Sequence, residues 1–194
     1  TFCFAPNGNL VAGGALNYGG SGQQLPAVVA FSSTGEKLWE QFFPQSSADP
    51  FYGVTVDGSG NIYAANKIAG GPAIWKLDPS GTKLWGYNYT GMNEPDRIAY
   101  ARGCLLLFND NFNWSGSYSV LDSNGAIKGS GTLSLNPSLR NIKAVFISEL
   151  GHAAVVGDNR AFGQGNGDAI VETFSFTGGA KEPQSIDFTQ PDVQ

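Results

Sequence analysis

The side chains best suited to chemistry are few and scattered along the chain. Its single histidine, His152, follows Gly151 at the start of an apolar stretch. No cysteine or carboxylate pattern beside it has the spacing of a metal site, and no nucleophile with a supporting acid accompanies it in the sequence. We therefore expect a turn or core role for His152. We predict no catalytic residue, no bound metal and no cofactor.

Two cysteines and one acidic turn complete the reactive groups. Cys3 and Cys104 belong to different sequence repeats, and a disulfide needs Cα atoms within about 7 Å. We expect free thiols that act as small apolar residues. The segment 57–61 (DGSGN) has some oxygen donors of a calcium loop but lacks its alternating acids and closing glutamate. We interpret this segment as a hairpin turn.

The elements that must position these groups repeat four times. Four glycines each precede a short apolar strand: Gly8, Gly60, Gly103 and Gly151. Four others each lie in a tight turn before a further strand: Gly35, Gly81, Gly125 and Gly179. A strand-and-turn period of about 40 to 50 residues is typical of a β-propeller. We therefore predict an all-β fold, a β-propeller built from four four-stranded antiparallel blades.

The predicted blades span residues 1–43, 51–89, 97–135 and 141–188 of a single propeller domain covering residues 1–194. The segment 2–4 (FCF) already alternates as a strand does, so we expect the chain to begin inside a structured element. Because each unit starts with its own innermost strand, no strand is left to complete a split blade. Two arrangements stay open: four blades that close on themselves, or four blades of a larger ring.

Composition excludes some classes of partner. Only 14% of the 194 residues are charged, whereas 27 are glycine and 12% are aromatic, a balance typical of a turn-rich all-β protein. The net charge is −5 without any basic run, so we predict no nucleic-acid partner. No apolar run approaches the roughly 20 residues of a membrane-spanning helix. The low charge and the abundance of Asn and Gly favour an extracellular or cell-surface location.

Two repeats share a tryptophan four residues after the turn glycine. The stretches 34–39 (TGEKLW) and 80–85 (SGTKLW), with 57–64 (DGSGNIYA), resemble the seven-bladed β-propeller repeats of secreted bacterial proteins. They are also similar to the tryptophan-docking blades of pyrroloquinoline-quinone (PQQ) dehydrogenases. The third and fourth repeats lack this tryptophan. Because large aromatics at equivalent positions fill the space between blades, we predict inter-blade packing for Trp39 and Trp85 rather than ligand stacking.

The connections between the second and third strands vary most, and we expect long loops at 14–26, 109–117 and 157–168. Binding residues gather on loops held by a rigid scaffold, and exposed aromatics beside amides and carboxylates suit sugars. The candidate ligand-binding residues are Asn17, Tyr18, Asp110, Asn113, Trp114, Asp158 and Arg160. In the alternative interpretation, Gly-rich loops simply tolerate polar residues and Trp114 covers the core.

These features predict a non-catalytic extracellular propeller that binds a protein or a carbohydrate through its long-loop face. Two alternatives stay open. One is an architectural subunit of a surface spike or filament, assembled from copies of this chain. The other is a fragment of a PQQ-type dehydrogenase. Asn88 and Asn113 match the N-glycosylation sequon and are candidate acceptors if the chain meets that machinery.

Overall fold

The structure is a computed structural model built from strands. It describes residues 1–18, 23–43, 50–68, 71–89, 95, 97–110, 116–133, 140–148, 152–158, 169–175 and 184–185. These residues form sixteen strands and no helix. Within these ranges, accordingly, there is no helix long and apolar enough to cross a membrane.

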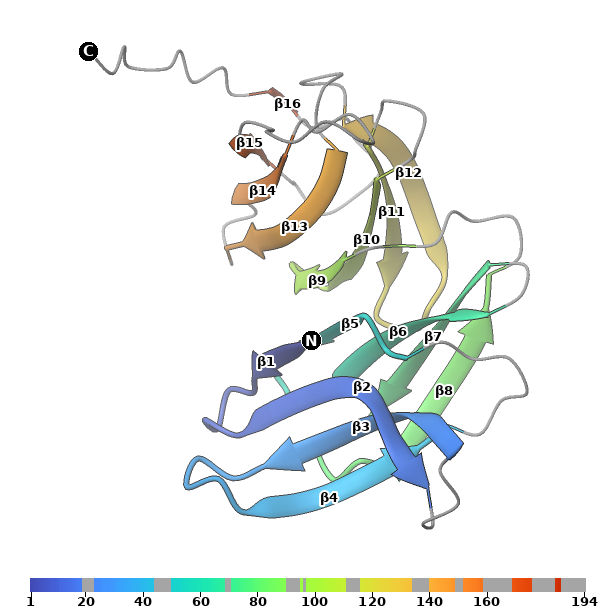
Figure 1. Ribbon diagram of the computed structural model, residues 1–194. Helices are drawn as coiled ribbons and strands as arrows, with labels where there is room; N and C mark the ends of the chain where they lie inside the picture. The colour runs from blue at the N-terminus through green and yellow to red at the C-terminus, as the bar shows by residue number, and fades with distance from the viewer. Residues whose placement is uncertain are drawn as a thin grey trace.

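Each blade is a four-stranded antiparallel sheet whose strands follow chain order (Figure 1). Blade 1 contains β1 (Phe2–Phe4), β2 (Leu10–Tyr18), β3 (Gln23–Phe31) and β4 (Lys37–Phe42). Blade 2 contains β5 (Gly53–Val56), β6 (Ile62–Ile68), β7 (Gly71–Leu77) and β8 (Lys83–Asn88). Blade 3 contains β9 (Arg97–Ala101), β10 (Cys104–Asp110), β11 (Gly116–Asp122) and β12 (Ile127–Leu133). Blade 4 contains β13 (Arg140–Ile147), β14 (His152–Asp158), β15 (Ala169–Ser175) and β16 (Gln184–Ser185).

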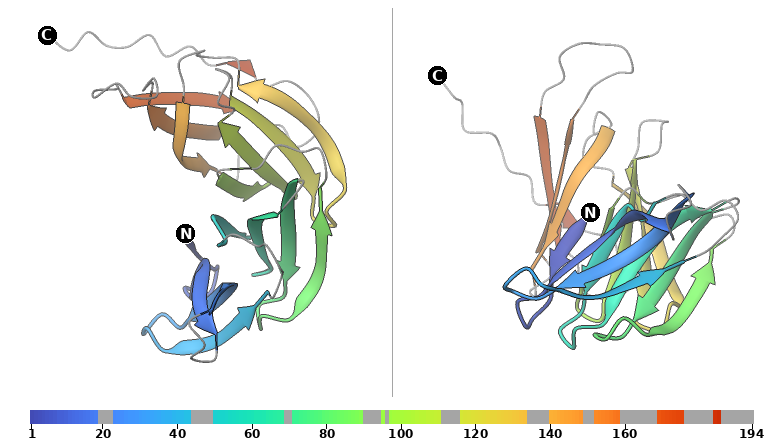
Figure 2. Two further views of the ribbon diagram at one scale, coloured as in Figure 1. Left: turned by 45° about the vertical axis from the view of Figure 1, so that its right-hand side comes forward. Right: turned by 60° about the horizontal axis from the view of Figure 1, so that its bottom comes forward.

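The four blades form an open arc. The first strand of each blade is innermost, and β1 contacts β5, β5 contacts β9, and β9 contacts β13. Figure 1 and the left view of Figure 2 show β1 and β13 on opposite sides of an opening. The predicted four-blade all-β propeller is thus confirmed, and its described blades do not close into a ring. The assignment of residues 1–194 to a single domain stays a prediction.

The hydrophobic core lies between blades, in three separate clusters. Successive side chains of a strand point to opposite faces of the sheet, so a blade between two neighbours needs apolar residues on both faces. In β6, Ile62 packs in the cluster shared with blade 1, and Tyr63 packs in the cluster shared with blade 3. A third cluster joins Phe108 of blade 3 to Val155 of blade 4. The apolar strands predicted from sequence therefore bury their side chains mainly against neighbouring blades.

Side-chain hydrogen bonds to main-chain carbonyls also cross each boundary between blades. Blades 1 and 2 are joined by Trp39 Nε1 to Pro79 O (3.1 Å) and by Lys83 Nζ to Phe42 O (3.0 Å). Blades 2 and 3 are joined by Lys76 Nζ to Ser123 O (3.1 Å) and by Tyr89 Oη to Gly125 O (2.6 Å). Blades 3 and 4 are joined by Arg97 Nε to Lys143 O (2.9 Å). These bonds fix how each blade sits on the next.

Aspartates organise two hairpin turns of blade 2, between β5 and β6 and between β7 and β8. Asp57 Oδ1 accepts the backbone N–H groups of Ser59 and Asn61, each at 2.9 Å. Asp78 makes the equivalent bonds in its own turn, and hydrogen bonds from that turn, led by the Ser80 hydroxyl, lower the pKa of its carboxyl group. Such side-chain acceptors satisfy turn N–H groups that lack ladder partners. The interpretation of 57–61 as a hairpin turn is confirmed.

Trp39 lies directly on the turn of the next blade. Its indole ring approaches to 2.7 Å of the position a Cβ atom would occupy at Gly81, whose φ is 86°. Only glycine combines this left-handed backbone with so close an approach. Trp85 packs in the core between blades 2 and 3, with its ring centroid 6.1 Å from that of Tyr63. The predicted inter-blade packing of both tryptophans is confirmed.

The connections between second and third strands are shorter than the sequence suggested. β2 and β3 stay paired as far as Tyr18 and Gln23, so most of the predicted 14–26 loop is strand. The reason is visible at Gly13, where a Cβ atom would lie 3.1 Å from Cβ of Phe51 in the segment entering blade 2. Gly13 therefore permits close packing instead of marking a turn. β10 and β14 likewise run on to Asp110 and Asp158.

We expect Gly81→Ala to lower the free energy of unfolding by about 2 kcal/mol more than Gly103→Ala, because overpacking typically costs about 1–3 kcal/mol. Both glycines have positive φ, so both variants carry a similar backbone strain of roughly 1–2 kcal/mol. Only Gly81 faces an indole; no described residue lies within 4 Å of a Cβ atom at Gly103. Urea unfolding followed by circular dichroism measures the difference.

A Trp39→Leu background supplies the control for this prediction. In that background, the loss of unfolding free energy caused by Gly81→Ala should approach the loss caused by Gly103→Ala, because the clashing ring is gone. Equal costs for the two glycine variants in the parent chain would contradict the docking of Trp39 on the turn.

Candidate functional site

Four of the predicted site residues lie at the ends of second strands. Asn17 and Tyr18 end β2, Asp110 ends β10 and Asp158 ends β14. These strands are equivalent members of blades 1, 3 and 4, so their ends meet the same face of the arc. The structure thus brings the backbone of these positions to one edge of the molecule. Three further predicted site residues lie outside the described residues: Asn113, Trp114 and Arg160.

This edge, which we call the second-strand edge, is made of paired hairpin ends. Asn17 is exposed and opposes Gln24 of β3. Asp110 opposes Gly116, the first residue of β11, and Asp158 opposes Ala169, the first residue of β15. The predicted site residues therefore belong to ordered ladder ends, where the sequence had placed them in loops.

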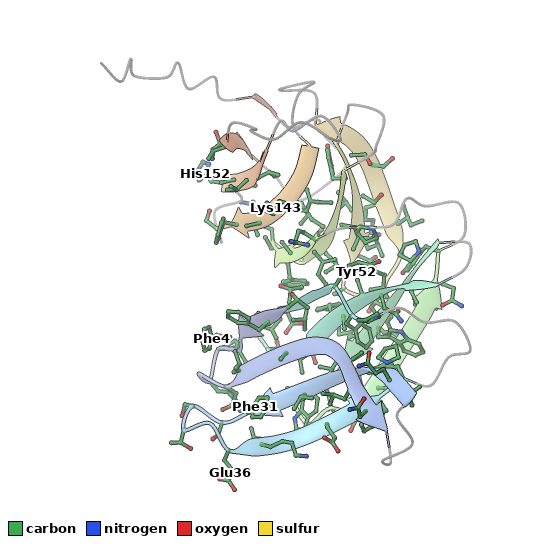
Figure 3. All side chains as sticks on the ribbon, viewed as in Figure 1. Phe4, Phe31, Glu36, Tyr52, Lys143 and His152 are labelled. Carbon is green, nitrogen blue, oxygen red and sulfur yellow. The ribbon has the colours of Figure 1, made fainter. Side chains whose placement is uncertain are left out.

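A cavity that was not predicted from the sequence lies at the axis of the arc. It has a volume of about 710 Å³ and is lined by residues from the inner strands of all four blades. Its lining includes Tyr52, Thr55, Arg97, Tyr100 and Lys143. Figure 3 shows Tyr52 and Lys143 on either side of β9. The signal that could have found it is the position of these residues in first strands, which line the axis of a propeller.

The wall of this axial cavity combines apolar and aromatic side chains with two cations, Arg97 and Lys143. Arg97 ties β9 to β13 through its hydrogen bond to the carbonyl of Lys143. Tyr100 stacks on Tyr63, with centroids 5.1 Å apart and planes 17° apart. Burial, with the nearby carboxylate of Asp57, raises the pKa of Tyr63, which donates a hydrogen bond to that carboxylate at 3.3 Å. The described lining residues include no Asp or Glu.

Both cysteines are free thiols, as predicted. Burial raises the pKa of Cys3 from its ordinary 9.0 to about 12. Burial also raises the pKa of Cys104. Because the thiolate is the reactive form, both side chains are neutral and poorly nucleophilic near pH 7. Cys3 packs at the edge of the core cluster between blades 1 and 2, which agrees with the predicted role as a small apolar residue.

His152 lies where the sequence placed it, at the start of an apolar strand. It is exposed at the start of β14, and its backbone N–H donates to Ser148 Oγ at 3.1 Å. The N–H of Ser148 in turn donates to the carbonyl of His152 at 2.9 Å. Its backbone thus closes a turn, as predicted. Of the two sequon residues, Asn88 is exposed at the end of β8, and Asn113 lies outside the described residues.

Comparison with known proteins identifies the fold. No protein-family model and no curated protein sequence matches the chain. Among solved structures, it is similar to quinohemoprotein alcohol dehydrogenase from Comamonas testosteroni, with 15% identity and a TM-score of 0.55 over 92% of this chain and 33% of that one. It is similar to the Dos1 propeller, with 13% identity and a TM-score of 0.54 over 90% of this chain and 44% of that one.

A third similar structure is the β-propeller domain of the trilobed protease from Pyrococcus furiosus, described as having an open velcro topology. The identity is 8% and the TM-score 0.53, over 97% of this chain and 57% of that one. The chain thus spans less than two thirds of each of these structures. At such identities the likeness shows the fold alone, and propellers serve dehydrogenases and proteases alike. The function must be argued from the site.

We expect the chain to lose stability above pH 9 because of Cys3. An unfolded thiol ionises near its ordinary pKa of 9.0, whereas the folded one stays protonated to about 12. Between these two pKa values the unfolded state binds fewer protons than the folded state. Rising pH therefore lowers the free energy of unfolding, by up to about 1.4 kcal/mol per pH unit. Between pH 8.5 and 10 the free energy of unfolding should fall about 1 kcal/mol more in the parent than in Cys3→Ala.

Urea unfolding at several pH values measures this difference. Cys104→Ala serves as the comparison, because the thiol of Cys104 also has a raised pKa, and removing it should leave the contribution of Cys3 in place. Identical pH slopes for the parent and Cys3→Ala would show that Cys3 is not shielded in the folded chain.

Proposed function

We propose that the chain is a non-catalytic binding module that works outside the cell and holds a protein or carbohydrate partner on its second-strand edge. The observation that carries this proposal is the convergence of Asn17, Asp110 and Asp158 on one edge from three different blades. Amides and carboxylates are the groups that bond sugar hydroxyls and peptide N–H groups. Spread over several blades, they suit an extended partner more than a small molecule.

The regular pairing of β2 with β3 supports this assignment. Asn17 lies in a ladder that runs without a register shift from Leu10↔Phe31 to Tyr18↔Gln23. A preorganised edge loses little conformational entropy when it binds, which improves affinity for a given set of contacts. The proposal also includes Trp114 and Arg160, an aromatic residue and a cation that follow Asp110 and Asp158 in the sequence.

The test uses a printed glycan array and a pull-down from culture medium, followed by affinity measurement on any hit. Asn17→Ala and Trp114→Ala should each weaken binding at least about tenfold, which corresponds to about 1.4 kcal/mol. The matched control is Glu36→Ala, at an exposed turn on the opposite edge of blade 1 (Figure 3). Equal losses from Glu36→Ala, or no loss from the other two, would contradict a site on the second-strand edge.

The alternative of a PQQ-type dehydrogenase fragment fits the residues less well. The fold is shared with a quinohemoprotein alcohol dehydrogenase. A calcium-bound quinone needs carboxylate or carbonyl oxygens for the cation, and the described lining of the axial cavity offers Arg97 and Lys143 without an Asp or Glu. The described lining residues therefore do not fit such a group. An architectural role remains the second candidate, favoured by the exposed apolar faces at both ends of the arc.

A further inference from the structure

The boundary between blades 2 and 3 contains a continuous series of tyrosine and tryptophan rings. It begins at Tyr100 of β9, which lines the axial cavity and stacks on Tyr63 of β6 with ring centroids 5.1 Å apart. It continues from Tyr63 to Trp85 of β8 at 6.1 Å, and from Trp85 to Tyr87 at 5.2 Å. Tyr89 lies 6.3 Å beyond Tyr87. Each ring thus has the next one as a direct neighbour, and we call this series the aromatic row.

The aromatic row runs from the axis of the arc to its outer surface. β9 is the innermost strand of blade 3, whereas β8 is the outermost strand of blade 2 (Figure 1). Tyr63 and Trp85 both pair with Lys76 of β7, so they lie in line across blade 2. Tyr63 is fully buried, whereas Tyr87 is 49% exposed. The row therefore has one end at the cavity and the other end in contact with solvent.

The other boundaries between blades have aromatic contacts of a different kind. Between blades 1 and 2, Phe43 contacts Phe51 at 4.8 Å and Trp75 at 5.0 Å. In the cluster between blades 3 and 4, Phe108 lies 6.5 Å from Tyr118. Phenol and indole rings lose one electron far more readily than a phenyl ring does. Among the described residues, only the boundary between blades 2 and 3 has a series in which every ring is of the oxidisable kind.

A proton acceptor accompanies the most deeply buried ring of the row. A phenol that has lost an electron is strongly acidic, and a buried cation is costly, so its oxidation requires a base nearby. The Tyr63 hydroxyl donates to Asp57 Oδ2 at 3.3 Å. The other oxygen of this carboxylate accepts the N–H groups of Ser59 and Asn61, which hold it in position. Asp57 can therefore take the proton when Tyr63 is oxidised and return it when Tyr63 is reduced.

We propose that the aromatic row conducts single electrons from the outer surface of blade 2 to a one-electron oxidant in the axial cavity. The oxidant belongs to the class of high-potential metal complexes or organic radicals. This activity goes beyond the proposed binding role and does not rest on it. Every ring of the row belongs to blade 2 or blade 3, so the two ends of the arc play no part in it.

The electron and proton steps balance as follows. Tyr100 gives an electron to the oxidant and a proton to water in the cavity, and it recovers both when Tyr63 reduces it and water returns the proton. Tyr63 gives its own proton to Asp57 and recovers it when Trp85 supplies an electron. Tyr87 then reduces the Trp85 radical cation and releases a proton to solvent. A thiol in solution restores Tyr87 by giving up a hydrogen atom, so the oxidant gains one electron and one proton is released.

A photosensitiser placed in the cavity tests the aromatic row. A ruthenium polypyridyl complex is attached at Thr55→Cys, a position that lines the cavity, in the full chain with Cys3→Ala and Cys104→Ala. A light flash with an electron acceptor in solution generates the oxidised ruthenium. A nitroso spin trap captures radicals at exposed side chains, and peptide mass spectrometry locates the adduct. We expect the main adduct on Tyr87, the exposed ring at the outer part of the row.

Phenylalanine substitutions interrupt the row while preserving most of the packing. Trp85→Phe and Tyr63→Phe should each lower the yield of the Tyr87 adduct at least about tenfold, which corresponds to about 1.4 kcal/mol in the barrier of the blocked step. The matched control is Trp75→Phe, the same change in the same blade but in the cluster shared with blade 1, which should leave the yield unchanged. Circular dichroism verifies that each variant folds.

The proton acceptor is tested with a second pair of variants. Asp57→Asn keeps an oxygen for the turn but removes the base, so the yield of the Tyr87 adduct should fall. Asp78→Asn changes the equivalent turn residue of the same blade, which hydrogen-bonds Ser80 and Thr82, and should leave the yield unchanged. A parent chain without an adduct on Tyr87 would overturn the proposal. Equal yields in the parent and the Trp85→Phe or Asp57→Asn variants, or equal losses in the controls, would overturn it as well.

Discussion

Burial of apolar side chains between successive blades is the constraint on which the rest of this structure depends. A strand of an inner blade presents side chains to both faces of its sheet, and both faces are apolar. Tyr63 and Ile62, adjacent in β6, belong to different core clusters for this reason. A single blade cannot satisfy such a pattern alone. Each blade is therefore stabilised by its neighbours. The docking of Trp39 on Gly81 sets how blade 1 packs on blade 2.

Much of the fold could be predicted from the sequence because its signals are local and repeated. The turn at Gly81 needs a glycine because its φ is positive. The apolar runs that begin near Ile62 and Leu105 both form the second strand of their blade. The predicted loop from Gly14 was wrong, because a glycine can serve a close contact, as Gly13 does, as well as a turn. Only the position of Phe51 across the blade boundary distinguishes these uses, and that contact is invisible in one sequence.

The candidate site was harder to predict, and for a physical reason. A strand end is assigned from sequence less reliably than a strand, so Asn17 and Asp110 were placed in loops although they close ladders. The axial cavity arises from first strands of four blades, and no short pattern records that Arg97 and Lys143 line one space.

The contact of each inner strand with the inner strands of adjacent blades has a consequence for cooperativity. Such an array behaves as a one-dimensional series, in which stability is roughly the sum of unit terms and nearest-neighbour terms. Blades 2 and 3 share an interface on each side, whereas blades 1 and 4 share one within the chain. Amide hydrogen exchange in a single arc would therefore be slowest in the middle and faster toward both ends. Closing the series into a ring would remove that gradient.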